Sequence, residues 1–158
     1  MLRKSESSTE PLDFFVELIE TFTDEANVYF VFEYLPGQSL FWILKNEVNL
    51  NLGKNGAKRR DWVQYYCSEL IIAVETLHSM HVIFRDLKPD NVMIDGTGHA
   101  KLIDFGFAKK LSKQNNFRTS TGCGTIGYNA PELYSGAAYS FPADIWSFGI
   151  LLAELLSG

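Results

Sequence analysis

Two short polar motifs, joined by a segment that predicts a tight hairpin, constrain the fold of this chain most strongly. The motifs are R-D-L-K-P-D-N at residues 85–91 and D-F-G at residues 104–106. Between them, two apolar runs flank D-G-T-G-H, whose Asp-Gly and Gly-His pairs favour a tight turn. A strand–turn–strand unit returns the chain to its starting point. We therefore expect one edge of a small β-ribbon to carry three oxygen-bearing side chains: Asp86, Asn91 and Asp104.

These side chains have the chemistry of a site for a hard divalent cation. Mg²⁺ prefers carboxylate and amide oxygens, and it commonly shares them with phosphate ligands. Lys88 lies between Asp86 and Asn91 and adds a positive charge. The sequence therefore predicts a nucleotide site that uses Mg²⁺.

The charge balance narrows the class of partner. The chain has 14 Lys and Arg residues against 19 Asp and Glu residues, a net charge of -5. This balance argues against a dedicated polyanion-binding protein, so no nucleic-acid partner is expected.

The chain also lacks the sequence signals of export or membrane insertion. Residues 1–13 carry charges where a secretion signal needs an apolar segment. The apolar stretch I-W-S-F-G-I-L-L-A-E-L-L at 145–156 is too short to span a bilayer, so it predicts a buried helix. Cys67 and Cys123 form no C-x-x-C motif and predict two reduced thiols. We expect a cytoplasmic protein, with the nucleus as the alternative.

The first part of the chain predicts strands. Residues 14–22 and 27–35 are rich in aromatic and β-branched residues, and they predict a hairpin whose second strand is buried. Residues 38–46 predict a short helix after Pro-Gly, and residues 46–61 a polar loop. The class expected is α+β.

A longer helix is predicted from Asp61, as its N-cap, to residue 80. Apolar residues recur there at helical spacing and form one stripe, which should face the core. The stripe consists of Val63, Cys67, Leu70, Val74 and Leu77.

The series R-D-L-K-P-D-N, D-F-G and A-P-E (residues 130–132) closely resembles the catalytic core of eukaryotic protein kinases. Lys88, two positions after Asp86, resembles the serine/threonine class. F-R-D-L-K-P-D-N, D-F-G-F-A-K-K-L and C-G-T resemble the cyclic-nucleotide-dependent (AGC-type) kinases.

The resemblance implies a truncated kinase-like fold, with a remnant of the N-lobe sheet and most of the helical C-lobe. Residues 1–32 would be the partial N-lobe, 33–37 the hinge and 38–158 the partial C-lobe. Ahead of Phe14 no G-x-G-x-x-G loop or strand lysine occurs, and Arg3 stands about where the paired helix glutamate is expected.

The same resemblance assigns roles to single residues. It makes Asp86 the catalytic aspartate, which accepts the proton of the substrate hydroxyl, and Lys88 the group that steadies the transferring phosphoryl. Asn91 and Asp104 would hold the metal ions. Phe84 would stack on Phe105. Thr125 would hydrogen-bond the catalytic aspartate, and Asp144 would hold the backbone of its loop.

Further roles concern the nucleotide base and regulation. Glu33 and Leu35 would offer backbone groups to adenine, while Leu40 and Met93 would lie against its ring. Thr121 stands where the resembled kinases carry an activating phosphothreonine, added by an upstream kinase, and Ser120 and Thr119 are the nearby alternatives. Arg85 and Lys109 match the basic residues that receive that phosphate.

The function implied is that of a serine/threonine protein kinase, which transfers the γ-phosphate of ATP to a Ser or Thr hydroxyl of a protein substrate. The missing phosphate clamp predicts that the isolated chain is inactive. The alternatives are a non-catalytic pseudokinase module that binds a nucleotide or partner, and a fragment without an independent fold.

Overall fold

The computed structural model describes residues 14–46 and 57–158. The expectations for residues 1–13, including Arg3, and for most of the loop at 46–61 lie outside the described residues. Within the described ranges, no helix has the length and apolar character needed to cross a membrane.

A β-hairpin opens the described chain, as predicted. Strand β1 (Leu18–Thr23) pairs antiparallel with β2 (Val28–Phe32). The Asp24 carboxylate closes the turn by accepting bonds from the backbone N–H groups of Ala26 and Asn27, each at 2.8 Å. These bonds, with one from the Tyr29 hydroxyl, lower the pKa of Asp24 to about 2.

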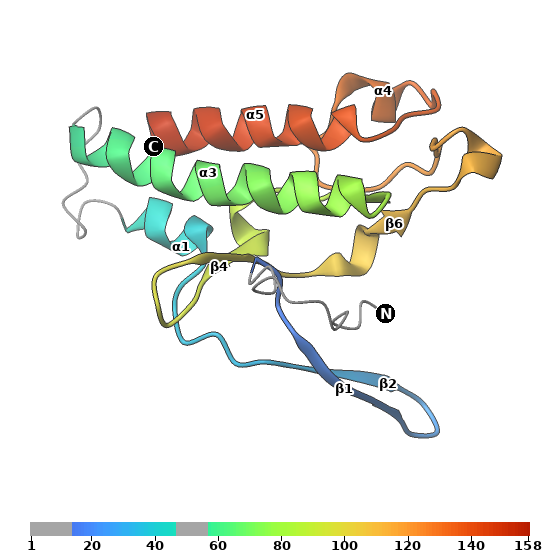
Figure 1. Ribbon diagram of the computed structural model, residues 1–158, viewed down its shortest axis with the longest axis horizontal. Coiled ribbons are helices and arrows are strands. Elements are labelled where there is room, and N and C mark those ends of the chain that lie inside the picture. Colours follow the sequence, from blue (N-terminus) through green and yellow to red (C-terminus); the bar gives the residue numbers. More distant parts are fainter. Residues whose placement is uncertain (1–13, 47–56) are drawn as a thin grey trace.

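The prediction that residues 27–35 form a buried strand is wrong. Every residue of β1 and β2 is exposed, including Ile19 and Phe30. The hairpin projects away from the helices, and no described element packs on either of its faces (Figure 1). Apolar composition predicts burial only when another surface covers the strand.

Two long helices form the body of the protein. Helix α3 (Ala57–Ser79) runs beside α5 (Pro142–Ser157), and the short helix α1 (Leu40–Lys45) lies nearby (Figure 1). The Ser39 hydroxyl caps α1 by accepting a bond from the Trp42 N–H at 3.2 Å. Helix α3 begins before Asp61, so the predicted N-cap is wrong. Ala-Lys-Arg-Arg favours helix and extends it upstream.

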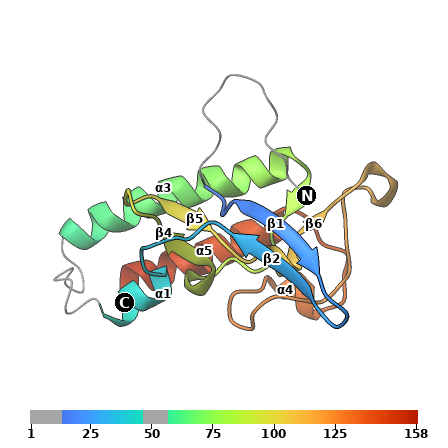
Figure 2. The same ribbon diagram turned by 90° about the horizontal axis from the view of Figure 1, so that it is seen from below.

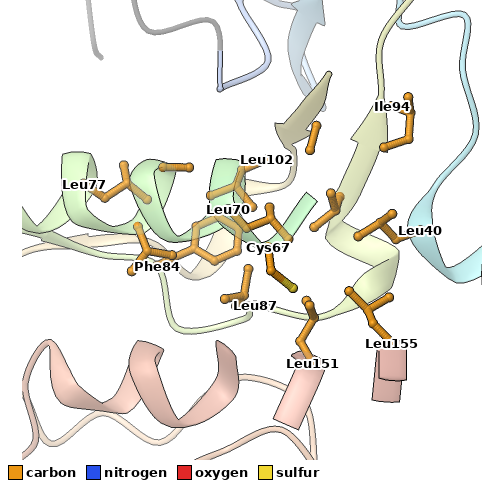
Figure 3. Packing of buried hydrophobic residues seen from close by; sticks show 14 of the residues in the cluster. Leu40, Cys67, Leu70, Leu77, Phe84, Leu87, Ile94, Leu102, Leu151 and Leu155 are labelled. Atoms are coloured by element: carbon orange, nitrogen blue, oxygen red, sulfur yellow. The ribbon is translucent and has the colours of Figure 1, made fainter. Parts of the chain in front are cut away.

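The predicted stripe of α3 is confirmed as its core face. All five residues are buried, and they pack with Leu151 and Leu155 of α5 and with Phe84, Leu87 and Leu102 (Figure 3). Burial raises the pKa of the Cys67 thiol to about 11, so it is protonated at neutral pH. Cys67 and Cys123 are both free thiols, as expected.

Short elements connect the long helices. Strand β3 (Val82–Ile83) pairs with β6 (Lys109–Lys110), and β4 (Val92–Ile94) pairs with β5 (Ala100–Leu102), all antiparallel. The β4–β5 ribbon confirms the predicted hairpin between the two polar motifs. The remaining short helices are η1 (Pro89–Asn91), η2 (Phe105–Phe107), η3 (Lys113–Asn115) and α4 (Pro131–Tyr134).

The architecture is a mixed α+β fold, as predicted. The β4–β5 ribbon and the β1–β2 hairpin lie on the same face of the helical pair (Figures 1 and 2). The polar loop at 84–91 connects β3 to β4, and its first residues contact the first turn of α5.

Candidate functional site

One buried carboxylate holds the backbone of the loop that carries R-D-L-K-P-D-N. Asp144, in the first turn of α5, has no exposed surface. Its two oxygens accept bonds from the backbone N–H groups of Phe84 and Arg85, both at 2.8 Å. His78 Nε2 lies 2.8 Å from the same carboxylate. These contacts confirm the expected role of Asp144, and they hold Arg85 at a positive φ of 73°.

Asp86 is the centre of a hydrogen-bonded group. It is 4% exposed, and its Oδ1 accepts a bond from the Thr125 hydroxyl at 2.6 Å. Its Oδ2 accepts a bond from Asn91 Nδ2 at 2.8 Å and lies 3.0 Å from Lys88 Nζ. Lys88 Nζ also donates to the Thr125 hydroxyl at 2.7 Å. The expectation for Thr125 is therefore confirmed, and Asp86, Lys88 and Asn91 come together.

Asp104 lies two residues after the end of β5, and it is exposed. Its backbone is left-handed, with φ 59°, and its carboxylate accepts a bond from the Gly106 N–H at 3.1 Å. The residue before it is tied to the loop, because Ile103 N–H donates to the Asn91 carbonyl at 2.9 Å. The ribbon thus returns Asp104 to the end of the loop, as its turn chemistry predicted.

The expected contact between Phe84 and Phe105 is confirmed, but the rings meet edge to face and are not stacked. The Phe105 ring contacts the Phe84 ring edge to face, with centroids 5.3 Å apart. Phe15 contacts Phe105 on another side at 5.9 Å. Apolar contacts of this geometry hold Phe105 and so restrict the backbone at Asp104.

The donor set suits magnesium. Asn91 Nδ2 donates to both the backbone carbonyl and the carboxylate of Asp86, which leaves its amide oxygen for a cation. Asp104 supplies an exposed carboxylate, and oxygen ligands are those that Mg²⁺ prefers. Across residues 14–46 and 57–158, no three His, Cys, Asp or Glu side chains gather as a metal site. A cation here would therefore depend on further oxygens from phosphate and water.

The connecting segment, residues 33–37, runs from β2 towards α1 and packs on β4. A Cβ atom at Gly37 would lie 1.9 Å from the Ile94 carbonyl oxygen, so only glycine allows this approach. Ile94 N–H donates to the Gln38 carbonyl at 2.9 Å, and the backbones of Ser39 and Met93 form an isolated antiparallel β-bridge. Glu33, Leu35 and Met93 are all partly exposed along this path.

One predicted ligand contact needs correction. Leu40 has no exposed surface and belongs to the hydrophobic core with Leu44 and Val63. Its position in the first turn of α1 turns the side chain into the core, so it lacks the access that a residue against the adenine ring requires.

The three predicted regulatory residues lie close together without direct side-chain contact between Arg85 and Thr121. Arg85 Nη1 donates to the Tyr139 hydroxyl at 3.2 Å, and that hydroxyl donates to the Thr121 carbonyl at 2.5 Å. Lys109 Nζ donates to the Thr119 hydroxyl at 2.9 Å, which in turn lies 3.5 Å from the Thr121 hydroxyl. Thr121 itself is exposed.

Sequence reasoning missed Tyr139 as the bridge in this group. It is 3% exposed, and burial raises its pKa. Its backbone pairs with that of Thr119, which brings its hydroxyl to the carbonyl of Thr121. A lone tyrosine before a Ser-Phe-Pro stretch carries no local signal of this role.

The spacing G-x-G-x-x-G does occur once, at residues 122–127, after D-F-G. Gly124 and Gly127 have positive φ angles of 88° and 99°. A Cβ at Gly124 would lie 2.5 Å from the Arg85 carbonyl oxygen. Gly124 therefore lets residues 122–127 approach the loop of Asp86. The motif does not form a turn between two strands.

Comparisons with a protein family and with individual proteins agree with the resemblance found in the motifs. The family described as "Protein kinase domain" matches residues 6–158. The cAMP-dependent protein kinase catalytic subunit PRKX of Homo sapiens is 42% identical over 145 residues, which cover 92% of this chain. Protein kinase C delta type of Mus musculus is 41% identical over 148 residues, again 92% of this chain. A third relative, 3-phosphoinositide-dependent protein kinase B of Dictyostelium discoideum, is 42% identical over 146 residues, or 90% of this chain.

The chain spans only part of the length of these relatives. The matched region covers 37% of the PRKX subunit, 20% of the protein kinase C and 15% of the Dictyostelium protein.

Proposed function

The chain belongs to the protein kinase family, and from this premise we propose that its residues catalyse transfer of the γ-phosphate of ATP to a serine or threonine hydroxyl of a protein. Its relatives at about 40% identity are AGC-type serine/threonine kinases, so the resemblance drawn from the motifs is confirmed. The observation that best supports the proposed reaction is the buried Asp86 carboxylate, held by Thr125, Asn91 and Lys88.

In this proposal Asp86 accepts the proton of the acceptor hydroxyl. Bonds to both of its oxygens restrict its rotation, so the carboxylate is oriented before a substrate arrives. Lys88 supplies a positive charge beside it, where negative charge develops on the transferring group. Asn91 and Asp104 would hold Mg²⁺, which supplies charge neutralisation on the phosphates.

The connecting segment supports the base side of the site. We assign residues 33–37 as the hinge between a partial N-lobe at 1–32 and a partial C-lobe at 38–158. Glu33 and Leu35 would offer their backbone groups to adenine, and Met93 on β4 would lie against the ring.

Magnesium-dependent nucleotide binding tests this assignment in the 158-residue chain itself. Asp104→Asn is expected to weaken binding of a fluorescent ATP analogue at least about tenfold in the presence of Mg²⁺, because a metal-binding carboxylate is lost. Without Mg²⁺ the two proteins should bind equally. Titration followed by fluorescence anisotropy measures both.

Asp90→Asn is the matched control, because Asp90 is an exposed acid on the neighbouring η1. It should change the affinity less than about twofold, as expected for an exposed charge. Equal weakening by both variants would show an effect of net charge alone, and no weakening by Asp104→Asn would contradict the assigned magnesium site.

Regulation by phosphorylation is proposed at Thr121. A phosphate there would add close to two negative charges and could reach Arg85 and Lys109, each one hydrogen-bonded residue away. The phosphate would thereby connect the chain around Thr121 to the loop of Asp86. The enzyme that adds this phosphate would be an upstream kinase.

Thr121→Ala is expected to lower kcat at least about tenfold, or roughly 1.4 kcal/mol of transition-state stabilisation. The assay uses a chimera in which residues 14–158 replace the matching part of the human PRKX subunit. The neighbouring hydroxyl supplies the control, since Ser120→Ala should retain full activity. Arg85→Ala should lower kcat non-additively with Thr121→Ala. Additive losses would refute the clamp.

A further inference from the structure

Lys101 on β5 is a buried cation that the proposed reaction does not use. Its side chain is 5% exposed, and its Nζ lies 2.8 Å from Glu33 Oε1. An ammonium group is buried at a high cost in solvation, which favourable partners must offset. The contact with Glu33 is one of the interactions that offset this cost. Glu33 is the first residue of the connecting segment.

Glu33 is also bonded to the start of the hairpin. Its N–H donates to the Glu17 carbonyl at 2.9 Å, and its Oε1 accepts a bond from the Glu17 N–H at 2.9 Å. The same carboxylate oxygen therefore contacts both Glu17 and Lys101. Three segments that are distant in sequence meet at this single side chain.

The same junction continues along the backbone. Leu102 N–H donates to the Phe14 carbonyl at 2.7 Å, and Val16 N–H donates to the Leu102 carbonyl at 3.0 Å. The start of the hairpin lies beside β5 in this region (Figure 2). Strand β5 thus joins the hairpin to the helical body.

The orientation of the hairpin depends on this junction, because all residues of β1 and β2 are exposed. Beyond the junction, no described element buries a residue of either strand. The chain continues from β5 to Asp104, and Lys101 itself pairs with Met93 of β4 across the ribbon. The junction therefore connects both sides of the proposed nucleotide site.

We propose that Lys101 is a positioning residue, which fixes the connecting segment and the hairpin relative to the β4–β5 ribbon through Glu33. In this way it sets the distance between the backbone groups proposed for adenine and the Asp104 carboxylate. The consequence for nucleotide rests on the proposed function, whereas the structural coupling does not.

Hydrogen exchange measured by mass spectrometry tests the coupling in the 158-residue chain. Lys101→Met should speed exchange at least about fivefold in peptides covering residues 17–37, where local opening becomes easier. Exchange in α3 and α5 should stay within about twofold of the unchanged protein. Lys101→Arg should restore protection, because it keeps a cation beside Glu33.

Lys110→Met makes the same change at an exposed lysine of β6 and should leave exchange in the hairpin unchanged. Faster exchange everywhere in Lys101→Met would mean a general loss of stability and would overturn the proposal, as would unchanged exchange at 17–37. Should Lys101→Met fail to fold, Glu33→Gln decides, because it keeps an acceptor for the Glu17 N–H and removes the charge. Protection of residues 17–37 in Glu33→Gln equal to the unchanged protein would overturn the proposal.

Nucleotide binding separates this inference from the proposed function. Lys101→Met should weaken binding of the fluorescent ATP analogue at least about fivefold, with recovery in Lys101→Arg. Absence of binding in the unchanged chain would count against the proposed nucleotide site, while the exchange measurements would still decide the role of Lys101.

Discussion

Changing Asp86 to asparagine in the PRKX chimera is expected to lower kcat at least about 100-fold, the lower range for loss of a general base. The amide is nearly the same shape as the carboxylate, and it can keep an oxygen near the Thr125 hydroxyl. It cannot accept a proton from the substrate hydroxyl. The loss should therefore appear in kcat, with KM for ATP little changed.

The control for this experiment is Asp90→Asn, which removes one acidic charge from the same region. Steady-state phosphorylation of a serine-containing peptide, with KM and kcat measured separately, distinguishes the two variants. A chimera with Asp86→Asn that retains more than about a tenth of the activity would contradict the assigned role. A chimera without activity even with Asp86 intact would favour the non-catalytic alternative.

Changing Asp144 to alanine is expected to lower the free energy of unfolding by about 3–5 kcal/mol, as for removal of one partner from a buried charged group. The carboxylate has no exposed surface and accepts two backbone hydrogen bonds. Without it, the N–H groups of Phe84 and Arg85 lose their acceptor inside the protein, and each buried unsatisfied group is costly.

Urea denaturation followed by far-UV circular dichroism measures this loss in the 158-residue chain. The matched control is Asp61→Ala, since Asp61 is an exposed acid within α3, and its effect should stay within about 0.5 kcal/mol. A loss below about 1 kcal/mol in Asp144→Ala would show that water replaces the carboxylate at this position.

Local sequence patterns predicted the central part of the site. The turn chemistry of D-G-T-G-H specifies a hairpin, and a hairpin returns Asp104 to the end of the loop that holds Asn91. The spacing within R-D-L-K-P-D-N similarly places Asp86 and Asn91 within hydrogen-bonding distance. These relations are short in sequence, so backbone geometry alone largely determines them.

Helical periodicity was equally informative for the core. The stripe from Val63 to Leu77 on α3 is buried as its spacing predicts, because helix geometry places these side chains on one face. The beginning of the helix was less predictable. Asp61 has the chemistry of an N-cap, but the preceding residues extend the helix, so a capping residue alone did not specify the boundary.

Tertiary structure decided which surfaces are covered. The apolar pattern of β2 predicted burial, yet its residues are exposed, whereas Leu40 was expected at a ligand and is fully buried. Alternation and composition describe what a strand or helix offers to a neighbour. Whether a neighbour packs there depends on the rest of the fold.

Sequence by itself determined the relations between residues that are close along the chain, including the kinase-like motifs and the contacts of Asp86 with Lys88 and Asn91. Only the tertiary structure decided that Tyr139 bridges Arg85 and Thr121, and that Lys101 meets Glu33 beside Glu17. Arg85 and Tyr139 are 54 positions apart in the sequence, and Lys101 and Glu33 are 68 positions apart. Their physical reason is that a buried donor or charge must find a partner in space, and the packing of distant segments determines which partner is within reach.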